Sequence, residues 1–431
     1  MRTRTNTYWF FLLCPLCFVL LLASCQKQDP TEQKIDRLLA KMTLDEKIGQ
    51  MTQVCGGWYS EDLENQVRNG AGSMLNSVGA EANHYQRIAV EETRLGIPMV
   101  FGRDIIHGFR TIFPIPLGQA ATFDPALVED AARLTAQEAV QAGLRWTFSP
   151  MVDVARDPRW GRIAEGYGED TYLTSVMGAA CVRGYQYPAS NSELSERSNS
   201  ASGLTSNSEQ RERSNILLAA CVKHFAGYGA SEGGRDYNTT WIPEVQLREV
   251  YLPPFKAALD AGSATIMCAF NDLNGVPASA NRHLNVDILR NEWGYNGMLV
   301  SDWASSANMI AHGNCADLKE ATLLSINAQM EMDMEGHGYP RYLKDLLAEG
   351  KITEKQIDAC VRDILRLKFR LGLFDNPYCA IDSAEFFTPE ALAAAQRAAE
   401  ESAVLLKNNG ILPISPLSAS GFALRLAGKS S

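Results

Sequence analysis

Positive charge is the first thing that this sequence has little of. Its 431 residues carry 40 Lys and Arg against 50 Asp and Glu, a formal net charge of −10. The charges are spread along the chain without a basic stripe, which argues against nucleic acid as a partner. The hydrophobic share of 46% can still bury a sizeable core. The length suits a large barrel plus an extra piece rather than one small domain.

The sequence also lacks the cysteine spacing of a disulfide-rich or zinc-binding protein. Seven of its ten cysteines lie beyond residue 25: Cys55, Cys181, Cys221, Cys268, Cys315, Cys360 and Cys379. The number is odd, and no Cys-x-x-Cys pair occurs among the seven, which argues against a disulfide framework or a zinc site. Most lie in apolar runs, which predicts buried thiols, although one disulfide stays open in an oxidising compartment. We expect neither a metal nor another cofactor.

Long hydrophobic runs are absent except at the start of the chain. Arg2 and Arg4 precede an apolar run over 8–22, and Leu22-Ala-Ser-Cys25 follows it. This order predicts a secretory signal over 1–25. The last four residues resemble a bacterial lipoprotein box, which implies lipidation of Cys25 and a periplasmic or outer-membrane lipoprotein of a Gram-negative bacterium. A plain signal peptide and an N-terminal membrane helix are the alternatives, and no other run approaches the roughly 18 apolar residues of a membrane span.

Short apolar runs alternate with helix-like segments from residue 70 to 340. The runs are Gly72–Leu75, Ile97–Phe101, Trp146–Val154, Leu217–His224, Ala264–Phe270, Gly297–Ser301 and Met330–Met334. The helical segments between them include Pro125–Gln141, Asp170–Arg183, Val245–Leu259 and Leu318–Ile326. Such alternation predicts an α/β fold with a parallel sheet, either a (β/α)₈ TIM-like barrel over 30–380 or a doubly wound open sheet.

Polar residues at the ends of these runs favour the barrel. They are Asn76, Arg103-Asp104, Asp153, Lys223-His224, Asn271, Asp302 and Asp333. In a parallel barrel the carboxyl ends of the strands meet at one face, and that face carries the active site. The polar residues therefore predict a catalytic face.

Two segments depart from the barrel pattern. Residues 189–215 are rich in Ser, Asn and Glu and predict a surface insertion. Residues 381–431 predict a linker and the truncated start of a second domain, because too few residues remain for an independent domain.

Two short segments combine cations, aromatic residues and glycine bends. They are Asp157-Pro-Arg-Trp-Gly-Arg162 and Val222-Lys-His-Phe-Ala-Gly-Tyr-Gly229. Hydrogen-bond donors, carboxylates and a Trp, with neither a phosphate loop nor metal spacing, favour a sugar site over a nucleotide site. A structural salt bridge remains the alternative for each residue taken singly.

The sequence resembles glycoside hydrolase family 3, close to its bacterial periplasmic β-glucosidase branch, from about Ile35 to Pro413. The motifs are Lys41-Met-Thr-Leu-Asp-Glu-Lys-Ile-Gly-Gln-Met51, Gly102-Arg-Asp-Ile-Ile-His-Gly108, the Asp157–Arg162 segment with Glu165-Gly-Tyr-Gly-Glu-Asp170, Lys223-His-Phe225, Glu232-Gly-Gly-Arg-Asp-Tyr-Asn238, Asn274-Gly-Val-Pro277 and Val300-Ser-Asp-Trp303. Several long motifs in the same order make the resemblance specific.

The resemblance implies a role for each matching residue. Asp302 corresponds to the nucleophile of a retaining mechanism, and Trp303 to an aromatic residue on the aglycone side. The residues implied to bind sugar hydroxyls are Asp104, Arg162, Lys223 and His224. Phe270 stands where many relatives have a Tyr that touches the nucleophile. Gln329-Met-Glu-Met-Asp333 replaces a commoner Gly-x-Asp-Met pattern.

No acid/base residue is predicted from this chain. Some family members use a His in the loop after Lys-His-Phe, but here that loop, 227–234, holds none. In the glucosidase branch the acid is a Glu of the α/β sandwich domain that follows the barrel, and the resemblance implies that only the lead-in to that domain is present here.

The resemblance therefore implies a retaining, exo-acting β-glucosidase that hydrolyses terminal non-reducing β-D-glucosyl residues of small oligosaccharides or glycosides. The alternatives are a catalytically incomplete sugar-binding remnant, a β-xylosidase and, more weakly, a phosphorylase. The only membrane association expected is the lipid anchor, and the sequence does not indicate an oligomeric state.

Overall fold

The computed structural model describes residues 29–57, 62–187 and 216–413. The predicted signal with Cys25, the predicted insertion 189–215 and the end of the chain from 414 lie outside the described residues. None of the described helices combines the length and the apolar character that a bilayer crossing requires.

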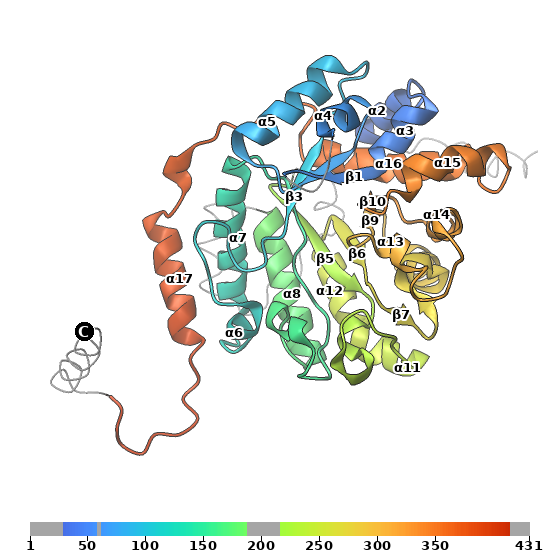
Figure 1. The fold of residues 1–431 in the computed structure, drawn as a ribbon. Helices are drawn as coiled ribbons and strands as arrows, with labels where there is room; N and C mark the ends of the chain where they lie inside the picture. The colour runs from blue at the N-terminus through green and yellow to red at the C-terminus, as the bar shows by residue number, and fades with distance from the viewer. Residues whose placement is uncertain (1–28, 58–61, 188–215, 414–431) are drawn as a thin grey trace, which may run out of the picture. The chain divides into compact units, whose positions relative to one another are not determined.

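The described residues contain an eight-stranded sheet in the order β10-β1-β2-β3-β4-β5-β6-β9 (Figure 1). The strands are β1 (Thr52–Cys55), β2 (Ser73–Leu75), β3 (Val100–Arg103), β4 (Trp146–Thr147), β5 (Ala219–Phe225), β6 (Thr265–Cys268), β9 (Met298–Val300) and β10 (Asp333–Met334). β1 pairs in parallel with β10 and β2, β4 with β3 and β5, and β5 with β6. A parallel bridge between Val300 and Met332 joins β9 to the residues before β10. This is the strand order of a (β/α)₈ barrel, which confirms the predicted fold class.

Of the eight strands of this sheet, the sequence pattern missed one, β1. Its residues, Thr-Gln-Val-Cys, do not form an apolar run, yet all four are buried. Gln53 is tolerated there because its Nε2 donates to Ser73 Oγ of the neighbouring β2 at 2.8 Å. A buried side-chain hydrogen bond replaces apolar packing and removes the sequence signal.

The chain divides into two compact units, which are described separately. The first unit holds the described residues of 29–101 and 279–378, and the second unit holds those of 102–278 and 379–413.

The first unit contains ten described helices, some of which have strong start signals. They are α2 (Pro30–Leu39), α3 (Leu44–Gln50), α4 (Leu63–Arg68), α5 (Gly79–Arg87), η1 (Ile88–Glu92), η7 (His283–Glu292), α13 (Ser305–Asn308), α14 (Leu318–Asn327), α15 (Gly338–Ala348) and α16 (Glu354–Arg370). Capping boxes begin α3 at Thr43 and α16 at Thr353. α16 packs on α2 and α3 through an apolar face that includes Ile357, Val361 and Ile364. The helical period of the apolar residues in 353–371 predicts this helix from the sequence alone.

The second unit contains three long helices and several short turns. Its helices are α6 (Pro116–Ala120), α7 (Pro125–Gln141), η2 (Gly161–Glu165), α8 (Thr171–Gln186), η3 (Tyr228–Ala230), η4 (Glu232–Gly234), α11 (Glu244–Gln246), η5 (Leu247–Tyr251), α12 (Pro253–Asp260), η8 (Ser383–Glu385) and α17 (Pro389–Glu401); η6 (Ala278–Ala280) begins at its boundary. A short antiparallel hairpin pairs β7 (Asp272–Leu273) with β8 (Val276–Pro277). α7 has the bounds that the sequence predicts, because Asp124 caps its first turn and Pro125 fixes its first residue.

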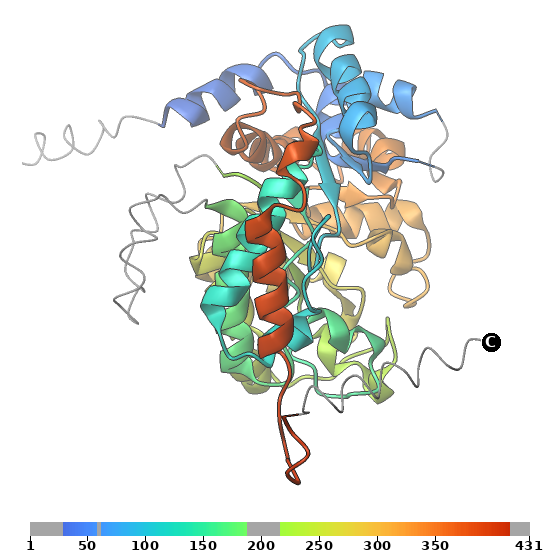
Figure 2. The ribbon, with the colours of Figure 1, turned by 90° about the vertical axis from the view of Figure 1, so that its left-hand side faces the viewer.

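α17 lies along α7 (Figures 1 and 2). Ala391 and Ala398 of α17 are buried in one apolar cluster with Leu127, Leu134 and Phe113. This part of the segment 381–431 therefore packs against α7 within the second unit.

Candidate active site

In the second unit, polar side chains gather where strands end. Asp104 follows β3, and Lys223 lies near the end of β5. Lys223 Nζ donates to Asp104 Oδ1 at 2.8 Å. The Lys223 side chain is only 4% exposed, whereas that of Asp104 is 54% exposed. The buried ammonium is thus held by a carboxylate that still faces outward and can accept a hydrogen bond from a ligand.

The next pair joins the residue after Lys223 to the loop that follows β4. Asp153 Oδ2 accepts hydrogen bonds from the backbone N of His224 at 3.0 Å and from its Nδ1 at 2.8 Å. Both residues are buried. Burial raises the pKa of Asp153 to about 7 and, with the charges of Arg162 and Lys223, lowers the pKa of His224 well below its usual value. The imidazole is therefore neutral, and the contact with Asp153 places its proton on Nδ1.

Arg162 belongs to η2 and is held by a two-pronged contact. Its Nε and terminal nitrogen donate to the two carboxylate oxygens of Glu165 at 2.7 and 2.9 Å. The guanidinium also lies 5.7 Å from the ring centroid of Tyr228. Both contacts fix the direction of the guanidinium while leaving it partly exposed, as a sugar-binding donor requires.

Tyr228 connects the parts of this cluster. Its ring meets the rings of His224 at 5.3 Å and Phe270 at 5.9 Å between centroids. Its hydroxyl donates to Asp236 Oδ1 at 2.5 Å, and Trp160 Nε1 donates to the same oxygen at 2.9 Å. The buried aromatic ring gives His224 and Arg162 a rigid common support.

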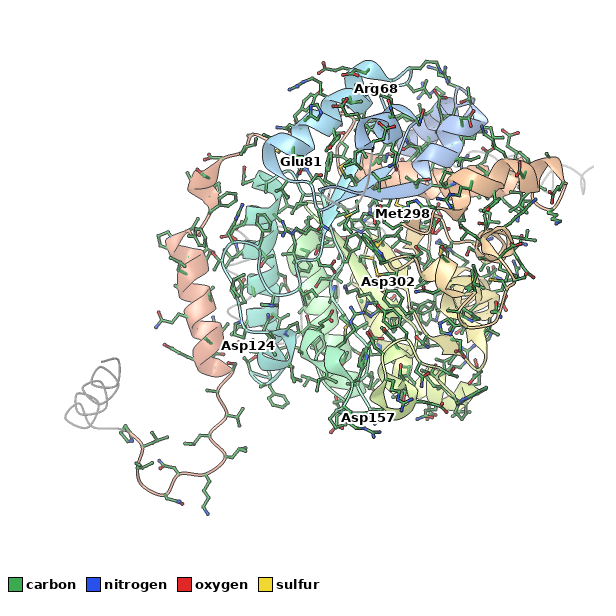
Figure 3. The ribbon with its side chains drawn as sticks, in the orientation of Figure 1. Arg68, Glu81, Asp124, Asp157, Met298 and Asp302 are labelled. Carbon is green, nitrogen blue, oxygen red and sulfur yellow. The ribbon has the colours of Figure 1, made fainter. Side chains whose placement is uncertain are left out.

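The first unit contributes Asp302, which follows β9 and is labelled in Figure 3 together with Met298, the first residue of that strand. Asp302 is 8% exposed, and its Oδ1 accepts a hydrogen bond from the backbone N of Trp303 at 2.7 Å. Ala304 has a φ of 51°, so the backbone turns sharply directly after this pair. The buried carboxylate is therefore held by the chain that follows it.

A second buried carboxylate supports that turn. Asp333 Oδ1 accepts from Ser306 Oγ at 2.7 Å, and Asp333 Oδ2 accepts from the backbone N of Gly338 at 3.0 Å. A Cβ at Gly336 would lie 2.2 Å from both Asp333 Oδ1 and Ser306 Oγ. Only glycine fits there, because any side chain would push this pair apart.

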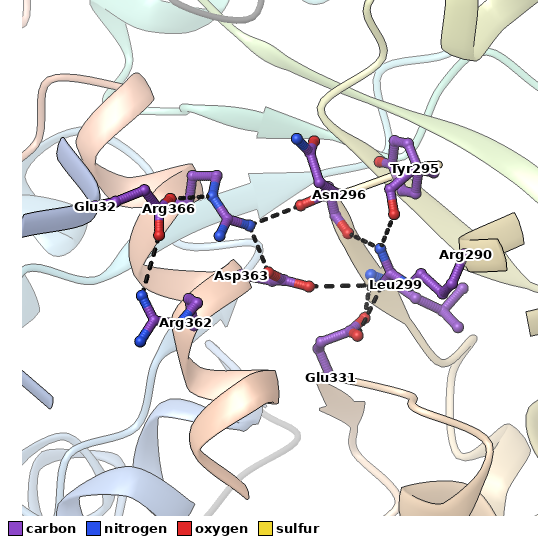
Figure 4. Close-up of polar contacts among 10 residues, drawn as sticks. Glu32, Arg290, Tyr295, Asn296, Leu299, Glu331, Arg362, Asp363 and Arg366 are labelled. Atoms are coloured by element: carbon purple, nitrogen blue, oxygen red, sulfur yellow. Dashed lines mark hydrogen bonds and ion pairs between the residues drawn. The ribbon is translucent and has the colours of Figure 1, made fainter. Parts of the chain in front are cut away.

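The contacts of residues 329–333 explain how this segment, which departs from the commoner family pattern, fits into the fold. Gln329 has a φ of 55°, a conformation that suits the commoner glycine. Glu331 is buried, pairs with Arg290 at 2.7 Å and accepts from the backbone N of Leu299 at 2.6 Å (Figure 4). Burial raises the pKa of Glu331 to about 8. These contacts hold β10 to its neighbour and place Glu331 in a structural network.

The predicted site residues thus fall into two groups. The second unit contains Asp104, Arg162, Lys223, His224 and Phe270. The ring of Tyr228 contacts Arg162, His224 and Phe270. Asp104 and Lys223 form a separate pair, and Lys223 directly precedes His224 in the sequence. Asp302 and Trp303 lie in the first unit. All of them follow or end strands of the same parallel sheet, or lie in the segments after those strands.

Sequence reasoning did not assign a site role to three supporting residues. Asp153 was visible as a strand-end carboxylate, but nothing in the sequence showed that it contacts His224. Glu165 and Asp236 lie in motifs of the resembling family, yet their partners became evident only from the fold.

The comparisons with known proteins decide the family. The model of the glycosyl hydrolase family 3 N-terminal domain matches residues 43–367. The chain belongs to glycoside hydrolase family 3. It is 39% identical over 395 residues to a periplasmic beta-glucosidase of Salmonella typhimurium, which covers 89% of this chain and 48% of that protein.

A solved structure agrees with this assignment. The beta-glucosidase of Listeria innocua in complex with isofagomine superimposes with a TM-score of 0.79 at 39% identity, over 88% of this chain and 52% of that one. A putative beta-xylosidase of Formosa agariphila is 33% identical over 412 residues. The chain spans about half the length of the relatives it matches.

Proposed function

We propose that this family 3 member is a retaining, exo-acting β-glucosidase that releases terminal non-reducing β-D-glucosyl residues from oligosaccharides or glycosides. The observation that carries the proposal is the carboxylate of Asp302. It follows a strand of a (β/α)₈ barrel, is almost buried and is oriented by the backbone N of Trp303. A fixed, nearly desolvated carboxylate is suited to attack an anomeric carbon.

In the proposed reaction an Asp302 oxygen forms a bond to the anomeric carbon as the bond to the leaving oxygen breaks. The leaving oxygen takes up a proton, and water later cleaves the glycosyl ester with retention of configuration. We assign no residue of this chain as the general acid/base, and the proposal places that group outside this sequence.

The second unit supplies the groups proposed to bind the sugar. Asp104 and Lys223 offer an acceptor and a donor in one pair, and Arg162 offers further donors. With its proton on Nδ1, His224 presents Nε2 as an acceptor. Donors and acceptors held in this way match the hydroxyl groups of a pyranose.

Covalent trapping tests the proposal. A 2-deoxy-2-fluoro glucoside with a dinitrophenolate leaving group is expected to add one sugar to the peptide that contains Asp302, as read by mass spectrometry. Asp302→Asn is expected to abolish labelling, because an amide does not form the ester. Asp333→Asn is the matched variant, since it changes a nearby carboxylate proposed to act only as a support. Labelling that survives in D302N would assign the nucleophile to another residue.

A β-xylosidase is the second candidate, because a putative beta-xylosidase is among the relatives at 33% identity. The labelling rates of matched 2-fluoro glucoside and 2-fluoro xyloside reagents distinguish the two. Faster labelling by the xyloside would favour the second candidate.

We also propose that the protein is exported and anchored by lipid at Cys25. The proposal rests on the Leu22-Ala-Ser-Cys25 sequence and on the Salmonella relative, which is described as periplasmic. Metabolic labelling with a radioactive fatty acid is expected to mark the protein, and Cys25→Ser is expected to remove the label.

A further inference from the structure

The second unit contains a cavity that none of the proposed sugar-binding residues lines. Its volume is about 550 Å³, and it lies between the segment after β4 and the segment after β5. The side chains that matter for its chemistry are those of Arg156, Asp157, Glu232, Trp241, Gln246 and Tyr251. Asp157 is labelled in Figure 3, and α11, which ends at Gln246, is labelled in Figure 1.

Trp241 is the most unusual residue of this cavity. Its side chain is 62% exposed, although an indole gains more than most side chains from burial. Exposed large apolar groups at a cavity are typical of a binding surface. Trp241 therefore offers a flat apolar face that nothing in the described chain covers.

The backbone on both sides of Trp241 is fixed. Thr240 N donates to the carbonyl of Asp272 at 2.9 Å, and Asn274 N donates to the carbonyl of Thr240 at 2.8 Å. The Asn274 amide also brackets Ile242, since its Oδ1 accepts from Ile242 N and its Nδ2 donates to the Ile242 carbonyl, both at 2.9 Å. The β7–β8 hairpin thus displays Trp241 from a rigid support, which lowers the entropy cost of binding.

Three side chains of the cavity have unused binding capacity. Within the described residues, no hydrogen bond or ion pair engages the indole of Trp241, the carboxylate of Glu232 or the amide of Gln246. They provide an aromatic face, an acceptor and a mixed donor–acceptor. Arg156, which lines the cavity together with Tyr251, adds donors.

The charges of the cavity favour a neutral ligand. Asp157 is already neutralised by Arg159, whose terminal nitrogen lies 2.5 Å from its carboxylate. The charges of Arg156 and Glu232 then balance. The centre of a protein–protein interface is depleted in charged residues. A single aromatic plane surrounded by charged and polar groups is therefore a poor match for an apolar protein partner. It suits a pyranose, which has an apolar C–H face and a rim of hydroxyls.

We propose that this cavity is a second carbohydrate-binding site, in which Trp241 stacks on a sugar ring and Glu232 and Gln246 bind its hydroxyls. It would hold a further part of a β-linked gluco-oligosaccharide or a separate chain of the same kind. The inference rests on the proposed function only for the class of sugar. The site itself stands on the cavity and the fixed Trp241.

The test measures binding of a β-linked glucose tetrasaccharide by titration calorimetry, using the full chain after its nucleophile has been trapped by the 2-fluoro glucoside. Trapping occupies the proposed catalytic site, so residual binding reports on the second site. Trp241→Ala is expected to weaken residual binding about tenfold or more, and Trp241→Phe to restore part of it. Val245→Ala is the matched control, because Val245 is 66% exposed nearby but does not line the cavity.

The rate of trapping is expected to be the same in W241A and the unmodified chain. If the reagent does not label the protein, the proposed function fails, and the same titration on the unlabelled chain still tests the cavity. Equal tetrasaccharide affinity of W241A and the unmodified chain would overturn the second site. A change of W241A in oligomeric state, with no change in sugar affinity, would likewise overturn it in favour of a contact between copies.

Discussion

At the scale of single residues, the candidate site is held together by contacts between buried polar groups that lie far apart in the sequence. Asp153 Oδ2 accepts two hydrogen bonds from His224, which is 71 positions away. No local sequence pattern encodes such a contact. Asp104, Lys223, His224 and Asp302 are visible as candidates in the sequence, because each lies at the carboxyl end of a predicted parallel strand.

The Asp153–His224 contact gives a pH-dependent prediction. The folded protein holds a proton on Asp153 up to about pH 7, whereas the unfolded chain releases it near pH 4. The contribution of this group to the free energy of unfolding therefore falls as the pH rises from about 4 to 7, and then stays constant. Asp153→Asn is expected to remove this dependence, as measured by denaturant unfolding at several pH values.

The same variant is expected to slow covalent trapping by up to about tenfold, since a hydrogen bond between neutral groups contributes roughly 0.5–1.5 kcal/mol. Asp153 contacts His224 and is proposed to position it. In a His224→Asn background, D153N should then add little further loss of trapping rate. Independent, additive losses would contradict the positioning role, and a pH profile unchanged from the parent chain would contradict the elevated pKa.

At the scale of elements, two helices show their bounds clearly in the sequence, whereas one strand of the barrel, β1, is not predicted. α7 and α16 are recognisable in the sequence from their N-terminal caps and from apolar residues at helical spacing, and α7 also has a proline in its first turn. β1 was missed because its buried Gln53 is satisfied by Ser73, a contact that depends on the neighbouring strand. A buried parallel strand is recognised in a sequence as a short apolar run, and a single polar residue is enough to interrupt a run of three or four residues.

α17 gives the prediction at this scale. Ala398 is fully buried against α7, whereas the adjacent Ala399 is exposed. Ala398→Glu is expected to lower the free energy of unfolding by about 1–3 kcal/mol, because a larger, charged side chain is forced into a packed interface. Ala399→Glu is the matched control and should change it by less than about 0.5 kcal/mol. Equal effects of the two substitutions in chemical denaturation would show that α17 does not pack on α7.

At the scale of the whole molecule, the order of the long motifs indicates the family and the fold. The proposed catalytic activity depends in addition on a general acid/base. A sugar alkoxide leaves only when it is protonated, and a positioned general acid contributes about 10²–10⁴-fold to that step. A dinitrophenolate leaves without such help. Because no residue of this chain is assigned as the acid/base, the two kinds of substrate are expected to behave differently.

The last prediction is therefore a defect that depends on the leaving group. With a dinitrophenyl glucoside the chain is expected to release one equivalent of dinitrophenolate in a burst and then to stall, since the proposed mechanism assigns no residue of this chain to activate the water that cleaves the proposed Asp302 ester. Azide, which attacks without a general base, is expected to accelerate the slow phase, whereas cellobiose turnover should be negligible. Stopped-flow absorbance measures the burst, and glucose release measures the turnover. D302N serves as the control without a burst. Cellobiose hydrolysis at an ordinary enzymatic rate, on the order of 1–10³ s⁻¹, would require an acid/base within this chain and would contradict the mechanism proposed for it.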